Sequence, residues 1–170
     1  MLTKTINLNK NHTNEENKIH KRKVVENLPE KFFNTYHQIS LLNSIYLDNK
    51  IRDEQYKKHL IKELDKKIAS YKNQDIIKKK YMDNNINREE TIEKLVTSKL
   101  RCYYCRKMMK LFYEEQRDPK QWTLDRVDNK QPHQNDNVVI ACLECNLKRR
   151  MTDKDKFLFT KQLKIVKQES

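Results

Sequence analysis

The sequence lacks glycine entirely, and alanine occurs only twice, as Ala69 and Ala141. Because other residues adopt positive φ angles only at a cost, we expect asparagine or aspartate to take the tight turns. No run of 18 apolar residues occurs, and the opening residues MLTKTINLNK contain no apolar core of an export signal. The sequence therefore predicts no membrane span and no secretion, and we expect an intracellular protein of the cytoplasm or nucleus of the producing or host cell.

Apolar residues are also scarce for a chain of 170 residues. They make up 36% of it, the same share as the charged residues, and the mean hydropathy is -1.07. This is too little to bury every segment in one core, so part of the chain should be exposed helix or disordered tail. The 37 Lys and Arg exceed the 24 Asp and Glu, giving a net charge of +13. Such a charge favours a polyanionic partner, DNA first among them, although a lysine-rich surface can also serve only solubility.

Three regions follow one another along the chain. Residues 1–27 are polar, mixed in charge and without periodicity, which predicts a disordered arm. Residues 28–100 carry apolar side chains at three- and four-residue steps, which predicts an α-helical region. We expect its helices from Pro29 to Tyr46, from about Asp53 to Tyr71, and from Asn87 to Leu100, with a turn at Asp48-Asn49. Asn87 and Glu90 have the spacing of a capping box. Residues 101–170 form the third region and contain all four cysteines.

The cysteines form two CxxC pairs, Cys102-Tyr-Tyr-Cys105 and Cys142-Leu-Glu-Cys145, with 36 residues between Cys105 and Cys142. Each CxxC turn directs two thiolates to one point, so two turns complete a tetrahedral site that suits Zn²⁺. No coordination position would stay open, which predicts a structural metal. Redox thiols or a fortuitous pairing are the alternatives.

Between the two pairs, short β-strands are expected at Lys110 to Tyr113, Trp122 to Arg126 and Asn137 to Ala141. A polar loop from Asp128 to Asp136 joins the last two, and a helix should start after Cys145. The predicted fold class is therefore α+β: a small zinc-stapled hairpin-and-helix domain preceded by the α-helical region.

The stretch from Leu100 to Asp155 resembles a known family. Its motif consists of Trp122-Thr-Leu-Asp-Arg-Val-Asp-Asn129, then His133, then Asn137-Val-Val-Ile-Ala-Cys-Leu-Glu-Cys-Asn146. This motif is similar to that of HNH endonucleases of the His-Me finger (ββα-metal) group. Phage recombination endonuclease VII and HNH proteins of large DNA viruses are the members it looks like. The resemblance implies a DNA endonuclease that hydrolyses phosphodiester bonds with one Mg²⁺ or Mn²⁺.

The resemblance also implies roles for individual residues. Asp125 and Asn146 match the cation ligands, and Asn137 matches the residue that pins the loop and orients the base. Arg126 stands where the family has its catalytic histidine, and an arginine cannot act as a base. His133, the only histidine between the cysteine pairs, is the replacement candidate, ahead of Asp128.

Basic residues gather after the second cysteine pair, where they could follow a DNA backbone: Lys148, Arg149, Arg150, Lys154 and Lys156. Arg126 could hold a phosphate or form a salt bridge with Asp125 or Asp128. Because the usual base is replaced, the alternative function is a catalytically degenerate module that binds nucleic acid or assembles with proteins. A plain zinc ribbon is a third possibility, but it leaves the coincidence of Asp125, Asn137 and Asn146 unexplained. Trp122, Tyr103 and Tyr104 are expected to pack around the hairpin and the metal.

Overall fold

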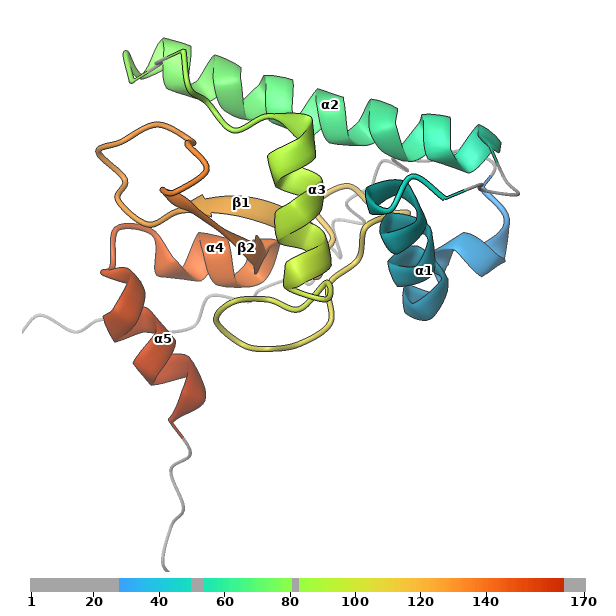
Figure 1. Cartoon of the computed structure of the whole chain (residues 1–170). Helices are drawn as coiled ribbons and strands as arrows, with labels where there is room; N and C mark the ends of the chain where they lie inside the picture. The colour runs from blue at the N-terminus through green and yellow to red at the C-terminus, as the bar shows by residue number, and fades with distance from the viewer. Residues whose placement is uncertain (1–27, 50–53, 81–82, 164–170) are drawn as a thin grey trace, which may run out of the picture.

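A computed structural model describes residues 28–49, 54–80 and 83–163 (Figure 1). The arm predicted at residues 1–27 lies outside the described residues. In chain order the elements are a short 3₁₀ helix Glu30–Phe33, α1 Thr35–Tyr46, α2 Glu54–Ile77, α3 Arg88–Thr97, β1 Trp122–Arg126, β2 Val138–Cys142, α4 Leu143–Arg149 and α5 Lys154–Gln162. This combination of helices with a two-stranded antiparallel sheet confirms the predicted α+β class.

The first predicted helix is interrupted at Asn34. The side chain of Asn34 accepts hydrogen bonds from the backbone N–H groups of Tyr36 and His37, at 2.9 and 3.3 Å. Asn34 thereby caps α1 and separates it from the 3₁₀ turn before it, so the single helix expected from Pro29 was wrong. The capping box before α3 is confirmed, because Asn87 and Glu90 bond reciprocally to each other's backbone N–H.

The first three α-helices end in the same way. A residue with positive φ follows each helix: Asp48 after α1, Lys79 after α2, and Lys99, together with Leu100, after α3. The next N–H then bonds back to a carbonyl in the last turn: Asn49 to Ser44, Lys80 to Asp75, and Leu100 to Leu95. Asp48 follows the expectation that Asn or Asp replaces glycine in such turns. The expectation is wrong for the other positive-φ residues, which are Lys79, Lys99, Leu100, Arg106, Arg117 and Arg150.

The hairpin of β1 and β2 pairs Trp122 with Cys142, Leu124 with Ile140 and Arg126 with Val138. The strand predicted at Lys110 to Tyr113 does not form beyond one isolated bridge from Lys110 to Gln121. The buried Gln38 of α1 explains this, because its side-chain amide bonds the backbone of Leu111 and Phe112 that a neighbouring strand would need. A buried side chain from the helical region thus replaces a strand.

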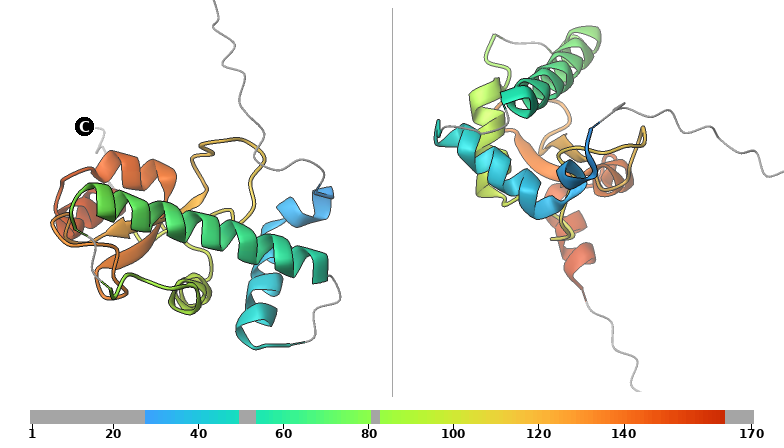
Figure 2. Two further views of the ribbon diagram at one scale, coloured as in Figure 1. Left: turned by 90° about the horizontal axis from the view of Figure 1, so that it is seen from above. Right: turned by 90° about the vertical axis from the view of Figure 1, so that its right-hand side faces the viewer.

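The hairpin lies between two helices. α4 packs on β1 and β2, whereas α2 crosses the opposite side of the molecule and reaches the hairpin through side chains (Figures 1 and 2). Lys67 of α2 donates to the carbonyl of Trp122 at 2.6 Å, and the N–H of Leu124 donates to the hydroxyl of Tyr71 at 3.1 Å. One cluster of buried apolar residues runs from Phe32 near the start to Phe157 in α5.

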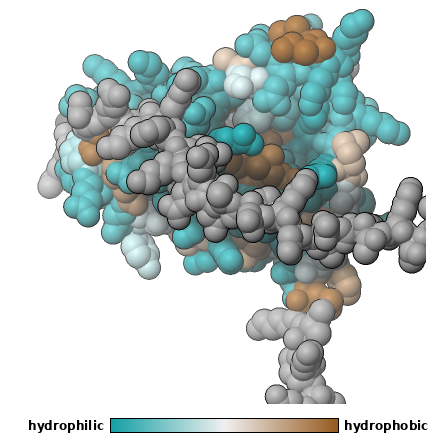
Figure 3. Space-filling model, turned by 180° about the vertical axis from the view of Figure 1, so that it is seen from behind, coloured by the Kyte–Doolittle hydropathy of each residue, from teal (hydrophilic) through white to brown (hydrophobic). Residues whose placement is uncertain are grey.

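The surface is mostly hydrophilic on the face shown in Figure 3, with apolar side chains in small separate groups. Exposed apolar residues include Ile77 at the end of α2 and Tyr36 in α1. Within the described ranges, none of the helices combines the length and the apolar composition needed to cross a membrane.

Candidate functional site

The four cysteines come together at one end of the hairpin. Their sulfur atoms all lie within 4.8 Å of one another, and the Sγ atoms of Cys105 and Cys142 are 3.9 Å apart. A tetrahedral ion with metal–sulfur bonds of about 2.3 Å sets its sulfurs about 3.8 Å apart. None of the four forms a disulfide. The cluster therefore fits a structural metal ion such as zinc.

Backbone hydrogen bonds shape the first cysteine pair into a tight knuckle. The N–H of Arg106 donates to the carbonyl of Cys102 at 3.0 Å, and the N–H of Cys102 donates to Lys107 at 3.0 Å. Arg106 takes a φ of 59°, which closes the turn. Tyr103 joins the knuckle to the hairpin, because its N–H donates to the carbonyl of Ile140 in β2 at 2.9 Å.

The second cysteine pair lies where β2 passes into α4. Cys142 ends the strand and is the N-cap of the helix, and Cys145 lies in its first turns. The hydrogen bond between the thiols of Cys102 and Cys142 lowers the pKa of Cys102 and raises that of Cys142. The two sulfurs therefore share a proton, which a metal ion bound by thiolates would displace.

Asp125 of β1 lies at the centre of a buried cluster with Tyr104 and Arg149. The guanidinium of Arg149 donates to both carboxylate oxygens, Nε to Oδ2 at 2.6 Å and Nη2 to Oδ1 at 2.9 Å. The hydroxyl of Tyr104 donates to Oδ2 at 2.6 Å, and Asp125 is only 4% exposed. The carboxylate of the expected cation ligand is thus neutralised within the chain by a bidentate ion pair. We call Asp125, Tyr104 and Arg149 the Asp125 cluster.

Arg149 does not face solvent as the predicted DNA contact would have to. It is 1% exposed and also donates to the backbone carbonyls of Arg126 and Thr152. This prediction was wrong because the short helix α4 turns Arg149 inward, onto the hairpin. The seven residues of α4 are too few for their hydrophobic periodicity to show which side of the helix is buried.

Asn146, the second expected cation ligand, lies beside the Asp125 cluster on α4. Its amide nitrogen donates to the hydroxyl of Thr123 at 3.0 Å and to the carbonyl of Leu124 at 3.4 Å. These bonds fasten α4 to β1. Asp125 and Asn146 thus share one interface, and each is engaged by groups of the hairpin or of α4.

His133 lies on the other side of the hairpin. Successive strand side chains point to opposite faces, so Asp125 faces α4 while Arg126 faces α2. There the carboxylate of Asp75, fully buried near the end of α2, meets His133 and Arg126. Both oxygens of Asp75 lie 2.9 Å from Nδ1 of His133, and Nη1 of Arg126 is 3.4 Å from Oδ1. The predicted base is therefore separated from the predicted cation ligands by the sheet.

Two further donors complete this second group. The backbone N–H of His133 and the side-chain amide of Asn85 donate to Oδ2 of Asp75, at 2.8 and 2.9 Å. We call Asp75, Asn85, Arg126 and His133 the Asp75 cluster. Burial lowers the pKa of His133, against an opposing influence of the neighbouring carboxylate.

Sequence reasoning missed Asp75 altogether. A signal existed, because Asp75 continues the stripe of Leu64, Ile68 and Tyr71 on the buried side of α2. A lone carboxylate on an apolar stripe needs a partner once it is buried. Of the two partners expected for Arg126, neither is its acceptor, since Asp75 takes that place.

Asn137 spans the loop between the strands. Its amide donates to the carbonyls of Asp128 and Pro132, at 3.0 and 2.9 Å, and its oxygen accepts from the N–H of Asp128 at 2.9 Å. These contacts hold the two ends of the loop together. The carboxylate of Asp128 caps the turn by accepting from the N–H of Lys130 at 2.8 Å.

The remaining basic residues after Cys145 differ in their surroundings. Lys148 pairs with Glu144 at 2.6 Å and Lys154 with Asp155 at 3.5 Å. Arg150 and Lys156 are exposed. As expected, Trp122 and Tyr104 are buried, and Tyr103 is half-buried against Tyr104.

Among the residues that the structure describes, the four cysteines are the only group of three or more His, Cys, Asp or Glu side chains placed to share a metal ion. No protein-family model, curated protein or solved structure matches the chain. What the site can do is therefore inferred from its own side chains.

Proposed function

We propose that this chain is a zinc-stapled module that binds nucleic acid through its basic surface and does not cleave it. The observation that carries this proposal is the bidentate pairing of Asp125 with the buried Arg149. A one-metal nuclease needs that carboxylate open to a cation and to the scissile phosphate. Here the side chains of Arg149 and Tyr104 occupy it, so the cation would have to displace the buried guanidinium of Arg149.

Zinc is the ion we propose for the cysteine cluster. Four thiolates around one point match its preference for tetrahedral sulfur ligands, and the site has no open position for a reacting water. Its role is to join the loop after α3 to the end of β2 and the start of α4. Binding of the ion adds free energy to a fold whose apolar content is low.

Charge supports nucleic acid as the partner. The chain carries a net charge of +13, and cations such as Arg101, Arg106 and Arg150 are exposed without an ion pair to any described residue. Phosphate backbones bind such surfaces by releasing counterions, which requires no catalytic group.

An endonuclease is the second candidate, favoured by one observation at the Asp75 cluster. His133 is held by a buried carboxylate at Nδ1, as general bases commonly are. That arrangement would need a cation site on the α2 side of the hairpin, away from Asp125.

One experiment distinguishes the two candidate functions. Zinc-loaded full-length protein is titrated onto fluorescently labelled DNA at several salt concentrations, and in parallel incubated with supercoiled plasmid and Mg²⁺ or Mn²⁺. We expect salt-dependent binding and no nicking. Nicking that disappears in His133→Gln would overturn the binding-only proposal, whereas nicking that persists in both His133→Gln and Asp125→Asn would indicate a contaminating nuclease.

A further inference from the structure

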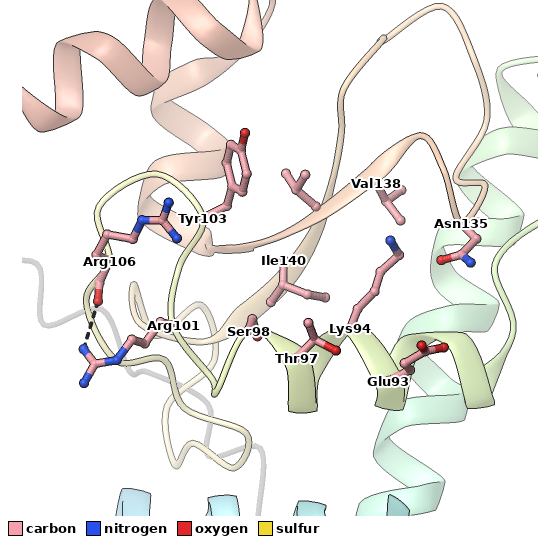
Figure 4. A pocket seen from close by; sticks show the side chains of 11 residues that line it. Glu93, Lys94, Thr97, Ser98, Arg101, Tyr103, Arg106, Asn135, Val138 and Ile140 are labelled. Atoms are coloured by element: carbon pink, nitrogen blue, oxygen red, sulfur yellow. Dashed lines mark hydrogen bonds between the residues drawn. The ribbon is translucent and has the colours of Figure 1, made fainter.

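A groove of about 450 Å³ lies between α3 and the outer edge of β2 (Figure 4). Its walls come from the end of α3, the first cysteine knuckle and the loop before β2. In Figure 4, Arg101 and Arg106 lie at one end and Asn135 at the other, with Lys94 rising from α3 between them. The groove is distinct from the Asp125 and Asp75 clusters.

The groove is basic. Lys94, Arg101 and Arg106 line it, and none of them forms an ion pair with a described residue. Glu93 is the one acidic residue in its lining. The guanidinium of Arg101 donates to the backbone carbonyl of Arg106 at 3.2 Å, which keeps the two side chains at the same end while leaving both positive charges uncompensated.

The outer edge of β2 adds backbone groups to the groove. The bond from the N–H of Val127 to the carbonyl of Asn137 makes these two residues a hydrogen-bonded pair, so Val139 and Ala141 also turn toward β1. Val138 and Ile140 consequently direct their backbone N–H and C=O outward. The carbonyl of Ile140 is taken by the N–H of Tyr103. On this register the N–H groups of Val138 and Ile140 lie on the edge of β2 that lines the groove.

Tyr103 supplies an aromatic ring at the rim between two cations. The ring centre lies 5.8 Å from Cζ of Arg106 and 5.7 Å from Nζ of Lys154. It packs edge-on against Tyr104 with an angle of 88° between the rings, which fixes its orientation. An oriented aromatic ring beside basic side chains is the combination on which unpaired bases stack.

Building on the proposed function, we propose that this groove binds a short segment of single-stranded nucleic acid. Phosphates contact Lys94, Arg101 and Arg106, and a base stacks on Tyr103 with its edge toward the outward amides of β2. The burial of Val138 and Ile140 in the groove wall favours a single strand, whose bases are free to enter, since the bases of a duplex are stacked inside it.

The test compares two triple variants of equal charge in the zinc-loaded full chain. Lys94→Gln/Arg101→Gln/Arg106→Gln neutralises the groove, and Lys58→Gln/Lys62→Gln/Lys66→Gln neutralises three exposed positions on α2. Binding of labelled dT12 is followed by fluorescence anisotropy against salt concentration, with zinc content and circular dichroism confirming that both variants are folded.

We expect the groove variant to bind dT12 at least about tenfold more weakly than the α2 variant at low salt. Its slope of log K against log salt should be smaller by about 0.7 for each lost phosphate contact. Equal affinities and slopes for the two variants would overturn the groove while leaving the proposed function in place. Failure of the wild type to bind any nucleic acid would overturn the proposed function as well.

Three further experiments need only the wild-type protein, and each can contradict the proposed groove. Photocrosslinking to dT12 containing 5-iodouracil should label the peptide that includes Tyr103, and a crosslink confined to other peptides would contradict the site. A duplex that competes better than dT12 would contradict the single strand. Poly-glutamate competing as well as dT12 would show a general polyanion surface instead.

Discussion

Arg149 shows how one residue can change the meaning of a whole motif. As a surface residue it would contact DNA, but buried against Asp125 it neutralises the carboxylate on which cleavage would depend. Buried ion pairs of this kind are costly to break, because the remaining charge is left in a low-dielectric site. The Asp125 cluster therefore stabilises the fold, and its carboxylate is not free for catalysis.

Replacing Arg149 with methionine should test this directly. We expect Arg149→Met to lower the free energy of unfolding by roughly 3 to 5 kcal/mol, because Asp125 loses its partner. The exposed neighbour serves as control, with Arg150→Met expected within about 0.5 kcal/mol of the wild type. Urea unfolding measures both.

A double variant separates the ion pair from packing. Asp125→Leu/Arg149→Met removes both charges and should regain much of the stability lost in Arg149→Met. Should Arg149→Met be as stable as the wild type, Asp125 would not depend on Arg149, and its carboxylate could be regarded as open to a cation.

The positive-φ residues make a second prediction at the residue scale. Lys99 is exposed, follows α3 and has a φ of 50°. Lys99→Gly should raise the free energy of unfolding by roughly 0.5 to 1 kcal/mol, since glycine relieves the strain at some entropic cost. Lys62→Gly, inside α2, should lower it by about 1 kcal/mol. Equal destabilisation by both substitutions would contradict the assigned backbone strain.

At the scale of elements, α2 organises the loops around the hairpin. Asp75 near its end bonds Asn85, His133 and Arg126, which belong to three separate segments after it. α2 was predicted from its periodicity, but it runs past Tyr71 to Ile77 and so carries Asp75 into the core. One carboxylate thereby ties a helix to two loops and a strand.

This arrangement predicts a dependence of stability on pH. Burial lowers the pKa of His133, with Asp75 opposing and Arg126 and Lys78 adding to the shift. The unfolded chain then takes up a proton at His133 more readily than the folded chain does. Its contribution to stability should be complete above the unfolded pKa of about 6.5 and be lost as the pH falls below it.

Urea unfolding of the wild type and of His133→Gln between pH 7.5 and 5 checks this sign. The wild type should lose stability more steeply on acidification than the variant, whatever their difference at pH 7.5. Parallel pH profiles would show that His133 binds a proton equally well in the folded and unfolded chain.

For the whole molecule, the cysteine cluster and the core act together. Apolar side chains from the 3₁₀ turn near Phe32 to Phe157 pack into one cluster, and Cys102, Cys142 and Cys145 are among its buried residues. A metal ion at this position would hold α3, the hairpin and α4 at a single point. Its loss should therefore be felt beyond the residues that bind it.

Metal removal should unfold more than the two knuckles. Zinc-finger peptides gain roughly 10 to 16 kcal/mol from zinc, so stripping the ion with a chelator should lower the melting temperature markedly. The single tryptophan, Trp122, is buried, and its emission should shift to longer wavelength. Readdition of zinc should reverse the change. Unchanged emission and melting after complete removal would show that the metal is dispensable for the fold.

Much of the fold could be predicted from local patterns. The capping box at Asn87, the helical periodicity before residue 100 and the β-branched run of β2 were all readable, because each depends on neighbours in the sequence. The prediction of a strand at Lys110 to Tyr113 was wrong. Gln38, far away in the chain, bonds the backbone groups that a neighbouring strand would need. The helix break at Asn34 was missed although its cause is a local cap.

The sequence by itself determined the cysteine cluster. Each CxxC turn positions its own two thiols, so the fold only has to bring the two turns together. It also determined the basic charge that any partner must match. The tertiary structure alone decided what the residues between the cysteines do. It turned Arg149 inward onto Asp125 and carried His133 to Asp75 across the sheet. Burial and long-range pairing set these roles, and neither is encoded in the spacing of a motif.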